Sequence, residues 1–148
     1  MEVQEDFRDL LALFNAHNID YVIVGAHALA LHGAPRYTGD MDIFVKADRK
    51  NAQRILAALE EFGFGSVGLT PEDFAIPENI IQLGVPPVRV DIVTSLTGVS
   101  WDEVASGREK ALYGDVSTCY IGKEEFIRNK RALGRKKDLA DIEALGED

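Results

Sequence analysis

The sequence has almost no cysteine and no long apolar run. Cys119 is the only cysteine among 148 residues, which excludes an internal disulfide and a cysteine-based zinc site and predicts a reducing compartment. The acidic, polar residues 1–6 lack the character of a secretory signal, and no apolar run approaches membrane-spanning length. We therefore predict a cytoplasmic protein that has no membrane partner.

Positive charge is scarce as well. The chain has 16 Lys and Arg against 25 Asp and Glu, a net charge of −9, which disfavours a generic nucleic-acid coat protein because phosphate neutralisation supplies most non-specific affinity. Residues 123–137 are the exception, with seven basic side chains against two acidic ones. They predict either a solvated helix face or a patch for a short polyanion, such as a nucleotide or an RNA end. Asp138 and Asp141 follow Lys137, so part of this charge is expected in weak ion pairs along one helix.

Length and patterning predict one α/β domain over residues 1–148, with its core in 18–122 and two closing helices in 123–146. Of the chain, 46% is apolar, enough to bury roughly two-thirds of the unfolded surface. In the first half, apolar spacing and breaker residues predict a helix ending near 17–18, a strand at 20–24, a helix from 25, a strand from 40 and a helix over 48–63. An irregular stretch follows to residue 77, with a short helix near 71–74. The second half is predicted to contain a hairpin of 80–83 and 88–93, a helix at 101–106, short strands near 111–113 and 119–121, and closing helices broken near 134.

Two acidic residues stand one residue apart in the sequence TGDMDIFV, residues 38–45. In a strand the side chains of Asp40 and Asp42 point to the same face, where two like charges repel unless a cation lies between them. A divalent ion with oxygen ligands satisfies both carboxylates. We interpret the pair as a metal-binding site; the simpler alternative is that both acids solvate the start of a strand.

A glycine turn precedes this pair. The apolar stretch 20–24 is typical of a buried strand and breaks at Gly25 into a helix. Backbone N–H groups at a helix start are unpaired and carry the positive end of the dipole, so a phosphate can settle there. Gly25 and Ala26 leave that approach open. His27 and His32 are five residues apart and do not share a helix face, which predicts packing roles for them and no zinc site.

A third carboxylate lies in the strand pattern VRVDIV, residues 88–93. Asp91 shares its face with Arg89, while apolar side chains occupy the other face. An acid within such apolar sequence needs an arginine or a metal ion as its partner. Two interpretations stay open: an ion pair with Arg89 or Arg36, or a third carboxylate for the metal site.

These pieces together resemble the DNA polymerase beta-like nucleotidyltransferase superfamily. Its members have a hydrophobic residue and a Gly-Gly or Gly-Ser pair shortly before an Asp-x-Asp motif, and a third acid on a neighbouring strand. Here Gly25 and Ala26 follow Val24, the pair Asp40 and Asp42 begins after thirteen further residues, and Asp91 comes later. The runs 24–40 and 129–142 are also similar to small bacterial AbiEii-like and minimal nucleotidyltransferases.

The resemblance implies a mixed sheet flanked by helices, with a C-terminal helical pair. It implies a transferase that moves a nucleoside monophosphate from an NTP such as ATP to a hydroxyl of an RNA, a protein or a small molecule. Mg²⁺ or Mn²⁺ is the implied cofactor, with Asp40, Asp42 and Asp91 as catalytic residues and metal ligands. The residues expected to bind the nucleotide are Gly25, Ala26, Arg36, Thr38, Lys130 and Lys137.

Two alternatives to an active transferase stay open. The first is a catalytically silent nucleotide-binding or partner-binding protein of the same fold, for example one member of a toxin–antitoxin pair. Ala26 favours it, because the superfamily usually has Gly or Ser there and a methyl group now approaches the phosphate seat. The second is a nuclease that activates water, which leaves the glycine turn unexplained. The acceptor and the oligomeric state stay open, because acceptor selection in such folds lies in loops and partner domains.

Overall fold

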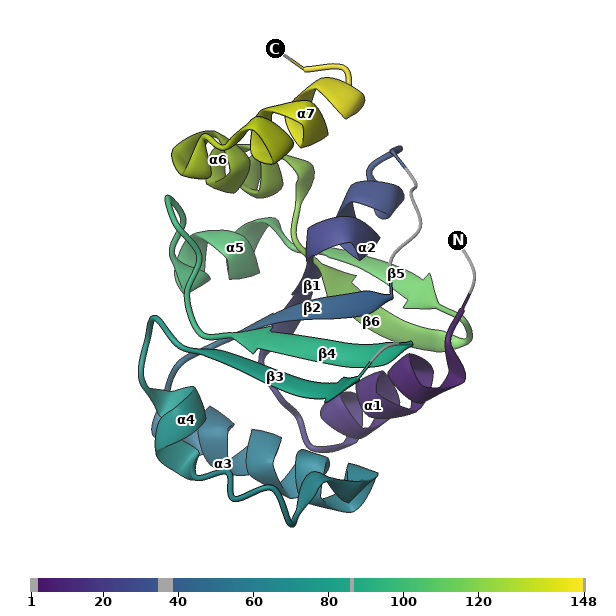
Figure 1. Cartoon of the computed structure of the whole chain (residues 1–148), viewed down its shortest axis with the longest axis vertical. Helices are drawn as coiled ribbons and strands as arrows, with labels where there is room; N and C mark the ends of the chain where they lie inside the picture. The colour runs from purple at the N-terminus through teal and green to yellow at the C-terminus, as the bar shows by residue number, and fades with distance from the viewer. Residues whose placement is uncertain (1–2, 35–38, 86, 148) are drawn as a thin grey trace.

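The computed structural model describes residues 3–34, 39–85 and 87–147 (Figure 1). Its helices are α1 (Glu5–Ala16), α2 (Gly25–Leu31), α3 (Arg49–Leu59), the π-helical turn η1 (Glu60–Phe64), α4 (Pro71–Ala75), α5 (Trp101–Gly107), α6 (Lys123–Leu133) and α7 (Lys136–Ala144). Its strands are β1 (Tyr21–Val24), β2 (Asp40–Val45), β3 (Ile80–Val85), β4 (Val88–Val93), β5 (Glu109–Tyr113) and β6 (Val116–Tyr120). The elements follow the order expected from the sequence.

A six-stranded mixed sheet, in the order β3-β4-β2-β1-β6-β5, forms the centre of the fold. Strand β2 runs antiparallel to β1 and parallel to β4, and β1 runs parallel to β6. Helices α1, α3 and α4 lie on one face of the sheet, and α2, α5, α6 and α7 lie on the other (Figure 1). The predicted α/β fold, with its mixed sheet and C-terminal helical pair, is therefore confirmed.

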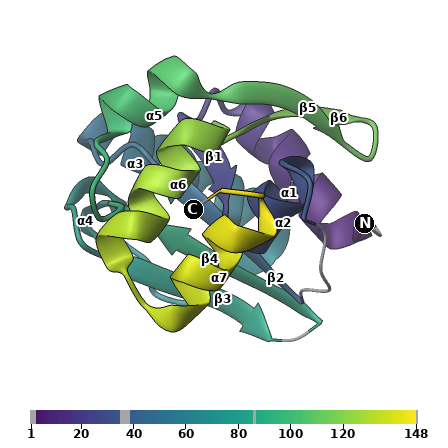
Figure 2. The same ribbon diagram turned by 90° about the horizontal axis from the view of Figure 1, so that it is seen from above.

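Short-range signals fix several helix ends. Asp48 caps α3 by accepting a hydrogen bond from the backbone N–H of Asn51 at 2.7 Å, as its position in the sequence predicted. Gly134 separates α6 from α7 in the left-handed conformation, with φ of 66°, which favours glycine. The chain turns back there, so that α7 packs beside α6 over β2 and β4 (Figure 2).

One boundary differs from the expectation. The helix predicted to stop at Gly63 continues from α3 into the π-helical turn η1, within which Gly63 adopts φ of 119°. Glycine tolerates this conformation without steric cost, so the turn changes direction there. Phe62, expected on the buried face of the helix, is consequently only half-buried and packs against Phe64.

The hydrophobic core includes buried residues from helices on both faces of the sheet, with α1 and α3 on one of them. The apolar residues of α1 that the sequence placed at helical spacing are all fully buried: Phe7, Leu10, Leu11 and Phe14. In β2, Met41 and Ile43 are fully buried, whereas Asp40 and Asp42, which alternate with them, are partly exposed. Among the described residues, no helix combines the length and apolar character needed to cross a membrane.

Candidate active site

Three carboxylates meet where β2 and β4 run side by side. In this parallel register Asp42 is opposite Asp91, and Asp40 is opposite Arg89. Because residues paired in register point to the same side of a sheet, these four side chains share one face. It is the face that α6 and α7 cover (Figure 2). The structure thus brings together the three acids that the sequence singled out.

The surroundings of Asp42 shift the pKa of its carboxyl group. Burial raises its pKa to about 6, and the negative charges of Asp91 and Asp40 add to this effect. The positive charges of Lys130 and Arg89 act in the opposite direction without cancelling it. A carboxylate in this position gains from any further cation, because the cation offsets both the burial and the repulsion.

Asp91 is already paired with an arginine. The Arg89 guanidinium donates to it from Nε at 3.0 Å and from Nη2 at 3.2 Å, each nitrogen to a different carboxylate oxygen. The ion pair with Arg89, one of two interpretations left open by the sequence, is therefore present. Within the described ranges 3–34, 39–85 and 87–147, no three His, Cys, Asp or Glu side chains are arranged to hold a metal ion.

Asp40 and Asp42 nevertheless suit a cation whose remaining ligands come from a substrate. Magnesium in phosphate-handling sites is commonly held by one or two carboxylates together with phosphate oxygens and waters. Burial and the neighbouring carboxylates raise the pKa of Asp42, so a further cation beside it would be favourable. The donor set therefore fits a divalent cation that arrives with a nucleotide, with these two acids as its protein ligands.

Gly25 belongs to the same site for a reason that the sequence did not reveal. It adopts φ of 67° at the start of α2, and a β-carbon there would overlap the carboxylate of Asp42. The turn therefore passes directly against the acid pair, and only glycine fits. Ala26 follows at the edge of the site. Any larger residue at position 25 would displace Asp42 as well as hinder a phosphate.

The acids open into a cleft of about 350 Å³ between the sheet and the closing helices. Its walls carry the glycine turn on one side and cations from α6 and α7 on the other; they include Gly25, Asp40, Asp42, Lys130, Lys137 and Asp141. Of the residues predicted to bind the nucleotide, Gly25, Ala26, Lys130 and Lys137 all line this cleft. Arg36 and Thr38 lie outside the described residues.

A buried network holds Lys130 at the cleft. Its Nζ lies 3.4 Å from Asp138 and 3.3 Å from Asp141. Asp138 is fully buried and also accepts a hydrogen bond from Arg135 Nε at 2.6 Å, which lowers the pKa of Asp138 to about 2. Lys130 is thus fixed where its charge acts on Asp42.

The sequence analysis missed this network. The sequence predicted weak ion pairs of this segment along one helix. The structure has such a pair between Arg135 and Asp138, and both Asp138 and Asp141 also pair with Lys130 of the preceding helix. The usable signal was their spacing, because residues 138, 141 and 142 share one helix face and Ile142 is apolar. Acids that share a face with a buried apolar residue need a buried cation.

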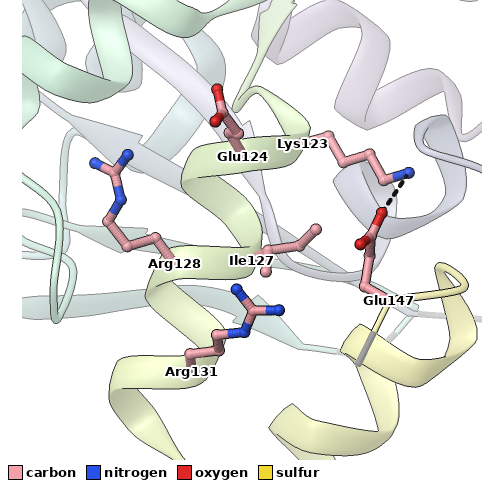
Figure 3. Close-up of a pocket in the computed structure, with 6 residues that line it drawn as sticks. All are labelled: Lys123, Glu124, Ile127, Arg128, Arg131 and Glu147. Carbon is pink, nitrogen blue, oxygen red and sulfur yellow. Dashed lines mark ion pairs between the residues drawn. The ribbon is translucent and has the colours of Figure 1, made fainter.

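Three further basic side chains of the segment, those on the outer face of α6, are drawn in Figure 3. Lys123, Arg128 and Arg131 surround a second pocket of about 350 Å³, with Ile127 at its base. Lys123 pairs with Glu147 at 3.4 Å, and Arg128 pairs with Glu103 at 2.7 Å. None of the three sequence-predicted carboxylates lines this pocket.

The two histidines of α2 have the packing roles expected of them. His27 is buried against Phe7 and Tyr113, and burial lowers its pKa despite a hydrogen bond with the backbone of Asp40. His32 donates from Nε2 to the carbonyl of Ile121 at 2.7 Å. The hydrogen bond between His27 and the backbone of Asp40 ties α2 to the start of strand β2.

The fold and the site together define the class of protein: a nucleotidyltransferase. A sequence model of the aminoglycoside-2''-adenylyltransferase family matches residues 6–95, which include the glycine turn and all three carboxylates. The chain belongs to this family. The resemblance to the nucleotidyltransferase superfamily is confirmed, and the AbiEii-like type stays a prediction. No curated protein matches the chain.

Solved structures share the fold at low sequence identity. A candidate nucleotidyltransferase from Thermotoga maritima is 16% identical, with a TM-score of 0.65 over 96% of this chain and 93% of its own. The antibiotic-resistance factor ANT(2'')-Ia is 12% identical, with a TM-score of 0.60 over 95% and 80%. The lincosamide antibiotic adenylyltransferase LnuA, with lincomycin bound, is 17% identical, with a TM-score of 0.56 over 97% and 96%.

Proposed function

We propose that this protein is a divalent-cation-dependent nucleotidyltransferase that moves a nucleoside monophosphate, with ATP as the first candidate donor, to a hydroxyl of a small cationic acceptor. One observation carries the proposal. Asp40 and Asp42 line a cleft together with the Gly25 turn and Lys130, and Asp91 lies opposite Asp42 on the neighbouring strand, on the same sheet face. A nucleotidyltransferase site needs carboxylates that bind a divalent metal ion and basic side chains that bind the phosphates.

The nucleotide would lie along the cleft with its triphosphate toward the turn. Backbone N–H groups at Gly25 and Ala26 are suited to the β and γ phosphates, although Ala26 contributes no hydroxyl. Lys130 and Lys137 supply point charges from the opposite wall. Asp40 and Asp42 would hold Mg²⁺ or Mn²⁺, which when bound neutralises the phosphate oxygens and polarises the α-phosphate.

The reaction balances as a displacement at the α-phosphorus. The acceptor oxygen forms a bond to that phosphorus, the bond from the phosphorus to the α–β bridging oxygen breaks, and pyrophosphate leaves with the electron pair. The proton of the acceptor hydroxyl passes to Asp91, whose register neighbour is Asp42. Arg89 fixes the direction in which the Asp91 carboxylate points.

Charge and family favour a small cationic acceptor over RNA. The net charge of −9 repels a polyanion and attracts a cation. The matched family is named for transfer to an aminoglycoside, and LnuA was solved with the antibiotic lincomycin. A polyamine-like hydroxylated compound is therefore our first candidate for the acceptor, with RNA and protein as the next to test.

The test is transfer of label from the α-phosphate of ATP. The purified protein is incubated with Mg²⁺, α-labelled ATP and separate acceptor pools: aminoglycosides, lincosamides, total bacterial RNA and protein extract. The expected result is label on a small hydroxylated acceptor, with release of pyrophosphate and dependence on Asp40 and Asp42. Tight ATP binding with no label on any acceptor would contradict the proposal.

That outcome would favour a second candidate function, a catalytically silent nucleotide-binding protein. Two observations support it: Arg89 already neutralises Asp91, and Ala26 replaces the usual Gly or Ser at the phosphate seat. A role as one partner of a toxin–antitoxin pair would be a special form of this candidate. Both candidates use the same cleft, so nucleotide binding alone does not separate them.

A further inference from the structure

Arg89 lies beside Asp40 of the acid pair and is bound to Asp91, the third acid. Strand β4 places Arg89 and Asp91 on one face, two residues apart, and the parallel register places Arg89 beside Asp40. Its guanidinium uses Nε and Nη2 to bind both oxygens of Asp91, at 3.0 and 3.2 Å. A fork on both oxygens leaves the Asp91 carboxylate fewer free lone pairs for a metal ion.

The surroundings make this ion pair persistent. The Asp91 side chain is 15% exposed and that of Arg89 is 32% exposed, so solvent screens the pair only in part. The positive charge also acts beyond Asp91, because Asp40 and Asp42 both help raise the pKa of Arg89. A guanidinium does not lose its proton in proteins, so its charge stays in place throughout the accessible pH range.

No other described cation is placed to take this role. Lys130 acts on Asp42 from the opposite wall, but its Nζ is bound by Asp138 and Asp141. A divalent ion between Asp42 and Asp91 would have to displace the guanidinium fork or lie against its positive charge.

We infer that Arg89 is the permanent counter-charge of Asp91, so that the cleft binds one divalent cation, on Asp40 and Asp42, and excludes a second one at Asp91. The inference rests on the proposed function for the cation site itself. Arg89 then does the work of a second cation, by neutralising and orienting Asp91 without exchanging with solvent ions. The chain would differ in this respect from sites that hold two metal ions.

The test counts Mn²⁺ bound per chain by electron paramagnetic resonance, with one equivalent of a non-hydrolysable ATP analogue and the analogue alone as blank. Four proteins are compared: wild type, Arg89→Met, Arg89→Lys and the control Arg49→Met. Arg49→Met also removes one positive charge, but Arg49 pairs with Glu72 of α4, on the opposite face of the sheet. Thermal unfolding confirms that each variant is folded.

We expect one Mn²⁺ in the wild type and in Arg49→Met, two in Arg89→Met, and in Arg89→Lys a second Mn²⁺ that binds more weakly than the first. If Arg89→Met does not fold, Arg89→Lys decides, because losing the fork while keeping a charge should give a second Mn²⁺ with at least about tenfold weaker affinity than the first.

Two bound Mn²⁺ in the wild type would overturn the inference while leaving the proposed function intact. No Mn²⁺ in the wild type would contradict the cation dependence of the proposed function and, with it, the single cation that the inference requires. Equal counts in the wild type and a folded Arg89→Met protein would overturn the inference.

Discussion

The two faces of helix α6 carry similar charges and border pockets of similar size, yet they differ in what surrounds each cation. On the inner face, Lys130 is 14% exposed and lies between the buried acids Asp138 and Asp141, at a cleft that contains Asp40 and Asp42. On the outer face, Lys123 pairs with the exposed Glu147 (Figure 3), and Arg128 pairs with the exposed Glu103.

This difference shows why the basic segment 123–137 is not one binding patch. Exposed ion pairs contribute little because water screens them and both side chains lose freedom. A buried cation held by buried acids has a fixed position, and its field reaches neighbours through a weakly screening medium. Under the proposed function the inner face presents charge to a ligand at Asp40 and Asp42, whereas the outer face follows the pattern of ordinary solvated surface.

The largest expected effect separates the cleft from the outer pocket in catalysis. Asp42→Asn removes a proposed cation ligand and should reduce nucleotidyl transfer by about 10³-fold, the scale typical of losing a charge-stabilising group at a reacting centre. Glu124→Gln in the outer pocket should change transfer less than about twofold. Both are measured with α-labelled ATP. Equal activity in the two variants would remove the distinction between the faces.

The next effect concerns stability. Asp138→Ala leaves Lys130 and Arg135 without their shared buried partner and should reduce the unfolding free energy by about 3 kcal/mol. Glu147→Ala breaks the exposed pair with Lys123 and should cost less than about 1 kcal/mol. Urea denaturation followed by circular dichroism measures both. A similar cost for the two substitutions would contradict the contrast between the faces.

The pH dependence of stability tests Asp42 itself. Its folded-state pKa of about 6 lies above the ordinary value of 3.8, so the folded protein binds this proton more tightly than the unfolded chain does. Ionised Asp42 therefore destabilises the cation-free fold above pH 6, and this cost disappears as pH falls toward 4.

Asp42→Asn should accordingly stabilise the cation-free protein more at pH 7.5 than at pH 4.5, by an amount on the order of 2 kcal/mol. Urea denaturation at the two pH values, with a chelator present, gives this difference. A difference that is independent of pH would show that Asp42 is not strained by its neighbours.

The smallest expected effect is on nucleotide affinity. Lys130→Met removes a charge from the cleft and should weaken binding of Mg²⁺ and a non-hydrolysable ATP analogue about tenfold, the value for one charge-assisted hydrogen bond. Arg128→Met removes a charge from the outer face of the same helix and should change affinity less than about twofold. Isothermal titration calorimetry measures both. Equal weakening would show that the charge acts only at long range.

Local patterns made much of this molecule predictable. The alternation of β2 placed Asp40 and Asp42 on one face, and the capping residue Asp48 marked the start of α3. These signals depend on neighbours within a few residues, so a single sequence contains them. The order of elements and the mixed sheet followed from such signals and from the superfamily resemblance.

Contacts across the fold were harder to predict. The pairing of Lys130 with Asp138 depends on how α7 packs against α6, and the close approach of Gly25 to Asp42 depends on the antiparallel pairing of β1 with β2. The sequence left two partners open for Asp91, and only the geometry of β4 selected Arg89. The first two of these contacts join segments whose relative position no local spacing determines, whereas Arg89 and Asp91 are two residues apart in one strand.

The most direct test of the central claim is to locate the nucleotide. A crystal structure of the protein with Mg²⁺ and a non-hydrolysable ATP analogue should show the α-phosphate beside Asp40 and Asp42, and the β and γ phosphates between the Gly25 turn and Lys130. A nucleotide found instead in the outer pocket of α6, on Arg128 and Arg131, would contradict the account.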